Sequence, residues 1–132
     1  MKTKILILFT LVSFISFGQK SPKKKTQGII NKTEITIEYS SPRVKGRMIF
    51  GDLVPNNEIW RAGANKNTTI SFSNDVKING KELSAGKYSF FIIPNATKTW
   101  TAILNKKNDG WGSYSYNESN DALRIEVKVQ NN

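Results

Sequence analysis

The sequence has neither cysteine nor histidine among its 132 residues. The chain therefore cannot form a disulfide, a Cys- or His-dependent nucleophilic triad, or the common zinc, copper and iron sites. A lipoprotein anchor, which is attached to a cysteine, is excluded as well. Only carboxylates and carbonyls remain as metal ligands, which would favour calcium or magnesium. The carboxylates of Asp109 and Asp121 flank one loop but form no recognised calcium motif, so we expect no metal and no cofactor.

Long apolar runs are also missing, except at the start of the chain. Lys2 and Lys4 precede an apolar stretch over residues 5–17, and small residues stand at Ser16 and Gly18. This order is typical of a secretory signal peptide with its cleavage site. The alternative, a retained membrane anchor, is disfavoured because the run has about 13 residues and a bilayer span needs about 20. We predict a cleaved signal peptide at 1–18, a periplasmic or secreted protein, and no transmembrane segment after cleavage.

The formal charge of +10 is concentrated near the N-terminus. Five lysines lie between the predicted cleavage site and the first predicted strand, at Lys20, Lys23, Lys24, Lys25 and Lys32. Because Pro22 and Gly28 disfavour regular structure, we predict a flexible basic leader over 19–32. It would be a solvated tail or would contact an anionic surface such as lipid head groups. We expect no nucleic-acid partner, since that function needs basic and aromatic side chains interleaved on the folded surface.

Alternation of apolar and polar residues dominates the rest of the chain and indicates half-buried strands. It predicts strands at 34–39, 68–73, 88–93, 99–105 and 123–129, and a hairpin at 76–83 that turns at Asn79-Gly80. We predict one domain over 33–130, all-β, an antiparallel β-sandwich of about seven or eight strands. Two segments lack this alternation, 40–67 and 105–121, and are predicted to be long loops. Function in small domains is commonly carried by such loops.

Arginine and tryptophan gather in these two predicted loops. The candidate ligand-binding residues are Arg43, Arg47, Trp60, Arg61, Asn65, Trp111 and Tyr114. Guanidinium groups bind carboxylate or phosphate through paired hydrogen bonds, and indole faces stack on sugars or cations. The alternative is architectural: the arginines would bond loop carbonyls, and the tryptophans would plug the ends of the sandwich.

Four ordered motifs resemble one family. They read Ser41-Pro-Arg-Val-Lys-Gly-Arg-Met-Ile-Phe-Gly-Asp-Leu-Val-Pro55, Trp60-Arg-Ala-Gly-Ala-Asn65, Ala85-Gly-Lys-Tyr88 and Trp111-Gly-Ser-Tyr114. This pattern, over about residues 28–130, resembles the DUF2911 family, exported β-rich proteins of Bacteroidetes-type bacteria without an established activity. The resemblance implies that the family's signature positions in this chain are Arg43, Gly46, Arg47, Phe50, Gly51, Leu53, Val54, Pro55, Trp60, Arg61, Gly63, Ala64 and Asn65.

The chain departs from that pattern at two places. The family tends to have an aromatic residue and glycine where this chain has Asn56-Asn57, and a glutamate where it has Lys66. The second departure weakens any catalytic role for this segment. We expect an exported, non-enzymatic binding or envelope-associated module for an anionic or sugar-like ligand. A structural or protein–protein module is the alternative, and a hydrolase that uses two carboxylates is the weakest hypothesis.

Overall fold

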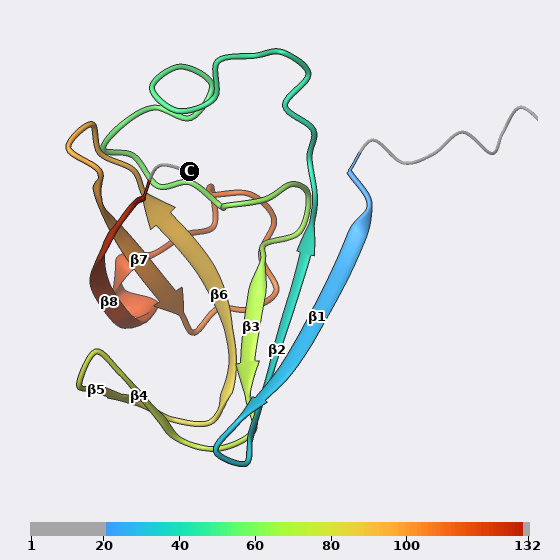
Figure 1. Cartoon of the computed structure of the whole chain (residues 1–132), viewed down its shortest axis with the longest axis vertical. Coiled ribbons are helices and arrows are strands. Elements are labelled where there is room, and N and C mark those ends of the chain that lie inside the picture. Colours follow the sequence, from blue (N-terminus) through green and yellow to red (C-terminus); the bar gives the residue numbers. More distant parts are fainter. Residues whose placement is uncertain (1–20, 131–132) are drawn as a thin grey trace, which may run out of the picture.

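Eight β-strands form the regular structure of residues 21–130, the part of the chain described by the computed structural model (Figure 1). Six of them form one antiparallel sheet in the order β1-β2-β3-β6-β7-β8, and β4 and β5 form a separate hairpin. The 3₁₀ turn η2 (Glu118–Asn120) precedes the last strand. The strand bounds are β1 (Lys23–Ile30), β2 (Thr33–Ser40), β3 (Thr69–Phe72), β4 (Val76–Ile78), β5 (Lys81–Leu83), β6 (Gly86–Ile93), β7 (Thr99–Asn105) and β8 (Asp121–Lys128).

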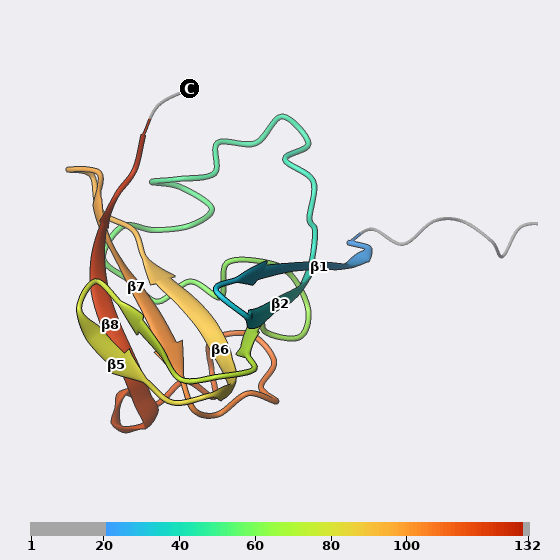
Figure 2. The same ribbon diagram turned by 60° about the horizontal axis from the view of Figure 1, so that its bottom comes forward.

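The main core lies between the large sheet and the β4–β5 hairpin. Its buried members are Phe72, Leu83, Tyr88, Leu104 and Leu123. Figure 2 shows the hairpin lying in front of the sheet over β6, β7 and β8. Apolar residues at every second strand position face this core, because side chains alternate between the faces of a sheet.

The opposite face of the sheet is covered by the loop that joins β7 to β8. Phe91 and Ile103 are 1% and 0% exposed, and the ring of Tyr116 from the loop lies 5.0 Å from that of Phe91. A row of polar side chains crosses this face through Thr69, Ser89 and Asn105, which pair in register on adjacent strands and are buried. The sheet is therefore covered by a hairpin on one face and by a loop on the other.

The predicted all-β, antiparallel fold is confirmed, and the second layer is a two-stranded hairpin rather than a full sheet. Every strand expected from alternation is present within two residues at either end. The turn at Asn79 and Gly80 has φ of 50° and 79°. Both positive angles fit the two-residue hairpin turn that an Asn-Gly pair favours.

The prediction of a flexible leader over 19–32 is wrong for most of its length. Lys23–Ile30 forms β1 and pairs with β2 along all eight residues. All eight β1 side chains are exposed, so no apolar face marks the strand in the sequence. Backbone pairing to a preformed edge suffices here. Gly28 is not required by sterics, since a Cβ at that position would meet nothing within 4 Å. The predicted signal peptide at 1–18 lies outside the described residues.

Long segments without strands run over residues 41–68 and 106–117, where loops were expected. The first leaves β2 and extends past the end of the sheet (Figure 1). It returns at Trp60, whose backbone exchanges hydrogen bonds of 2.8 and 2.9 Å with Ile92 of β6. Within residues 21–130 there is no helix of the length and hydropathy that would cross a bilayer.

Candidate functional site

Arg47 is used to close its own loop. Its Nε donates to the carbonyl of Val44 at 3.0 Å, and its Nη2 donates to the carbonyl of Arg43 at 2.7 Å. The backbone N–H of Arg47 also bonds Val44, with Lys45 and Gly46 at φ of 51° and 68°. This tight turn satisfies two guanidinium N–H donors internally, as the architectural interpretation predicts.

Arg61 has a comparable role in the next part of the loop. Its Nε donates to the carbonyl of Gly63 and its Nη1 to the carbonyl of Asn65, both at 3.1 Å. The segment is also tied down by Thr68, whose hydroxyl donates to the carbonyl of Ala62 at 3.0 Å. Gly63 is required here, since a Cβ would lie 2.7 Å from that hydroxyl oxygen.

Trp60 belongs to an aromatic cluster that supports the base of the long loop. Its ring meets Phe50 edge-on at 5.4 Å, and Phe50 lies 4.9 Å from Trp100 of β7. The indole N–H of Trp100 donates to the carbonyl of Asn95 at 2.9 Å. These contacts are typical of aromatic packing at the end of a sheet.

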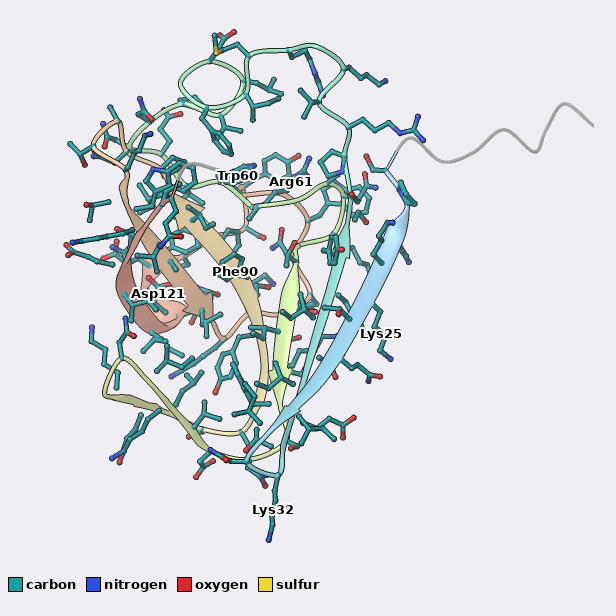
Figure 3. All side chains as sticks on the ribbon, in the orientation of Figure 1. Lys25, Lys32, Trp60, Arg61, Phe90 and Asp121 are labelled. Atoms are coloured by element: carbon teal, nitrogen blue, oxygen red, sulfur yellow. The ribbon has the colours of Figure 1, made fainter. Side chains whose placement is uncertain are left out.

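Three of the seven predicted ligand residues line one shallow hollow of about 320 Å³. They are Trp60, Arg61 and Tyr114, joined by Leu53 and Glu58. Figure 3 shows Trp60 and Arg61 side by side above the end of β6. Arg43, Arg47, Asn65 and Trp111 do not line this hollow. The predicted set is thus divided, and two of its arginines bond neighbouring carbonyls.

A larger pocket of about 430 Å³ lies elsewhere, where the β1–β3 surface meets the loop after β7. It is lined by five lysines and two carboxylates, together with neutral polar residues. The charged residues are Lys23, Lys24, Lys25, Lys66, Lys87, Glu38 and Asp109. Ion pairs within residues 21–130 involve none of these five lysines. We call this the lysine pocket.

Sheet register brings these lysines together. Lys25 pairs with Glu38, which pairs with Thr69, and paired residues point to the same face of a sheet. Lys23 pairs with Ser40 on the same face, two residues along. Lys87 joins them from β6 (Figure 3 labels Lys25 on β1). Lys24, which pairs with Tyr39, alternates to the other face of β1, so register accounts for a basic wall of Lys23, Lys25 and Lys87.

The loop side of the pocket is held by specific hydrogen bonds. The Asn108 side chain donates to the carbonyl of Lys87 at 3.1 Å, and the backbone N–H of Asn67 donates to the carbonyl of Gly110 at 3.1 Å. Gly110 leaves no room for a side chain, because a Cβ would lie 2.8 Å from Nδ2 of Asn67. This close approach fixes the pocket wall without any charged contact.

Asn67 is the most unusual polar group of the lysine pocket. The residue lines the pocket although it is only 7% exposed, and its buried Oδ1 has no hydrogen-bond partner in residues 21–130. Buried polar atoms are nearly always paired, and an unpaired one needs a reason. Ser40 and Thr69, also buried, give the rest of the lining a neutral polar character.

A second charged cluster lies across the sheet at the start of β8. Asp121 accepts from the Arg124 Nε at 2.9 Å, from the Tyr116 hydroxyl at 2.6 Å and from Asn105 Nδ2 at 2.8 Å. Burial and the hydrogen bond to Asp121 raise the pKa of Tyr116, and that same carboxylate raises the pKa of Arg124. Both carboxylate oxygens of Asp121 accept hydrogen bonds from groups of the loop and the sheet, so this cluster stabilises the loop.

Sequence reasoning missed the lysine pocket. Lys23, Lys24 and Lys25 were assigned to a flexible leader, and Lys87 stood in the Ala85-Gly-Lys-Tyr88 motif but was not among the candidate ligand residues. Lys66 gave the one usable signal, since it replaces a glutamate expected from the family resemblance.

Comparison with known proteins identifies a family. The family described as "Protein of unknown function (DUF2911)" matches residues 21–132, which includes β1 and all later elements. No curated protein and no solved structure matches significantly.

Proposed function

The chain belongs to the DUF2911 family, and from that premise we propose that it is a binding module for a small anionic ligand, held in the lysine pocket. The observation that carries this proposal is a cavity of about 430 Å³ lined by lysines, with Lys23, Lys25 and Lys87 on one face of the sheet and Lys66 on the adjoining loop. Cavities of this size accommodate small molecules, for which a few polar groups set the orientation. The proposal includes export of the protein, in keeping with the signal-peptide pattern of its first residues.

The chemistry of the lining favours a carboxylate or phosphate group. An ammonium group forms short, charge-assisted hydrogen bonds with such oxygens. These ammonium groups form no ion pair with another described residue, so a bound anion would not have to displace an internal partner. Ser40, Asn67 and Thr69 would add neutral contacts of the kind that recognise hydroxyl-bearing ligands.

Binding is favoured over hydrolysis by the state of the two pocket carboxylates. A carboxylate-based glycosidase needs one carboxyl group in an apolar setting that keeps it protonated. The Asp109 side chain is 79% exposed and lies 3.4 Å from the ammonium of Lys107. Glu38 is exposed on β2 and stands directly opposite Lys25. Neither setting is apolar.

The proposal is tested by thermal-shift and calorimetric titration. Both use the protein purified in the form in which the producing cells contain it. The probes are inorganic pyrophosphate, citrate and glucuronate, with glucose as the neutral comparison. A ligand that binds only the native state raises the Tm with its concentration. We expect at least one anion to do so, and its affinity to fall as salt rises.

Matched variants locate the site. Lys66→Gln with Lys87→Gln removes two pocket charges, and Lys32→Gln with Lys77→Gln removes two charges outside the pocket lining. We expect the first pair to weaken binding by about tenfold or more and the second pair to leave it nearly unchanged. Equal effects of both pairs, or no Tm shift with any anion, would refute the pocket as a binding site.

A further inference from the structure

The loop between β2 and Trp60 exposes apolar side chains that nothing in residues 21–130 covers. Val44 is 57% exposed, Met48 69% and Leu53 53%. The segment that carries them stands beyond the end of the sheet, away from the β4–β5 hairpin, in both views (Figures 1 and 2). Several large apolar side chains gathered on one projecting segment indicate an interaction surface.

The backbone that presents these side chains is held in place. Arg47 closes the turn below Val44 through the two carbonyl contacts described above. The following turn is closed by backbone bonds from Val54 to Ile49 at 2.8 Å and from Leu53 to Met48 at 3.3 Å. At the base, Phe50 packs against the two tryptophan rings. The apolar tips are therefore displayed by a structured loop.

Basic residues alternate with these tips. Arg43, Lys45 and Arg47 stand between and beside Val44 and Met48, and all three are exposed. Asp52 is the only acidic residue from 42 to 55. We call the residues 43–53 the basic apolar loop. Its composition combines positive charge with exposed aliphatic side chains.

An aromatic residue extends this surface. Tyr114, 83% exposed, lines the same hollow as Leu53, although it comes from the loop after β7. A tyrosine ring has an apolar body and a polar hydroxyl, which suits the boundary between water and lipid. Loops from two different parts of the chain thus contribute to one face.

We propose that the basic apolar loop, together with Tyr114, docks on the surface of an anionic lipid bilayer. Lipid phosphates would attract Arg43 and Lys45, and Val44, Met48 and Leu53 would enter the boundary between head groups and acyl chains. Peripheral binding of this type is driven by buried apolar area together with attraction to anionic lipid. A bilayer is favoured as the occupant because residues 42–55 carry three cations against one acid, an excess of positive charge that an anionic lipid surface attracts.

The test is flotation of the purified protein with phosphatidylcholine vesicles, with and without phosphatidylglycerol. We expect the protein to float only with the anionic vesicles and to be released by salt. Met48→Ser with Leu53→Ser should weaken binding by about tenfold, since each buried aliphatic side chain contributes to insertion. Arg43→Gln with Lys45→Gln should weaken it by about 25-fold, because each cation near the surface contributes about fivefold.

The matched control is Lys32→Gln with Lys77→Gln, which removes two charges at the other end of the molecule (Figure 3 labels Lys32 at the lower tip). It should float like the unmodified protein. Every variant keeps the same N-terminus, so the differences report the loop alone, and an unchanged Tm confirms folding. Equal flotation of all variants overturns the proposal. It is also overturned if sedimentation velocity shows self-association that Met48→Ser and Leu53→Ser abolish while vesicle binding is absent.

Discussion

The Tyr116 hydroxyl donates a hydrogen bond of 2.6 Å to Oδ2 of Asp121, which fastens the loop after β7 to the first residue of β8. Arg124 donates to the same oxygen at 2.9 Å. The loop held in this way covers Phe91 and then runs back to the wall of the lysine pocket. Stability of the pocket is thereby linked to a contact at the opposite edge of the same sheet face.

Replacement of Asp121 by asparagine should destabilise the protein by about 1–3 kcal/mol, because hydrogen bonds to a charged group are stronger than neutral ones. The new amide would place an N–H opposite the Arg124 guanidinium, whereas its carbonyl could still accept from Asn105. Urea unfolding measures the change. Asp109→Asn serves as control, since its partner contact is 3.4 Å long and the side chain is 79% exposed. If Asp109→Asn lowered the free energy of unfolding as much as Asp121→Asn, the stabilising role of Asp121 would be contradicted.

Stability at alkaline pH should depend on Tyr116. Burial and the bond to Asp121 raise its pKa above the ordinary 10.0 in the folded state. The unfolded chain therefore releases this proton first, and the stabilisation, complete below pH 10.0, is lost as pH rises through the folded value. Tyr116→Phe removes this dependence. A series of Tm measurements above pH 10.0 should fall less steeply for the variant. Parallel curves would show that the hydroxyl plays no such role.

Arg61→Ala tests the architectural role of that arginine. Loss of its bonds to the carbonyls of Gly63 and Asn65 should cost about 1 kcal/mol, which for a domain of this size lowers the Tm by several degrees. Anion binding in the lysine pocket should be unaffected, because Arg61 does not line it. Calorimetric titration of the variant with the anion tests this. If the variant folds but no longer binds the anion, the ligand site lies at the 60–65 segment instead.

Gly63→Ala should destabilise by about 1–3 kcal/mol through overpacking. The added Cβ would lie 2.7 Å from the Thr68 hydroxyl oxygen and 3.3 Å from the carbonyl oxygen of Ser40. Gly28→Ala is the matched control, because that Cβ would meet nothing within 4 Å. Chemical denaturation of both variants should separate them clearly. Equal stabilities would mean that the 61–65 segment can shift without cost.

Most of the fold follows from local sequence patterns, since burial on one face imposes alternation on a strand. The Asn79-Gly80 turn and the β7 strand are examples, and both lie at the predicted positions. β1 shows no such alternation, because both of its faces are exposed. Its eight residues pair through the backbone, which is the same for every residue type. Composition alone therefore suggested a disordered segment.

The candidate site was harder to predict than the fold. Motif chemistry identified Arg47 and Arg61, whose bonds turned out to be local. The lysine pocket instead depends on register between strands and on a loop contact between Asn67 and Gly110. Such contacts between distant residues leave no pattern along the chain. Only the unexpected Lys66 pointed toward this part of the surface.

The complete exposure of the β1 side chains determines how readily this strand separates from β2 in the native protein. A strand with no buried side chain is retained chiefly by its backbone hydrogen bonds to β2, and such elements open at a much lower free energy than the core. Amide hydrogens of β1 should therefore exchange with deuterium long before those of β6 or β7. Each opening would remove Lys23, Lys24 and Lys25 from the pocket wall at once. An anion that bridges β1 to Lys66 or Lys87 would slow this exchange. Ligand binding would then determine how much of the time β1 stays paired with β2.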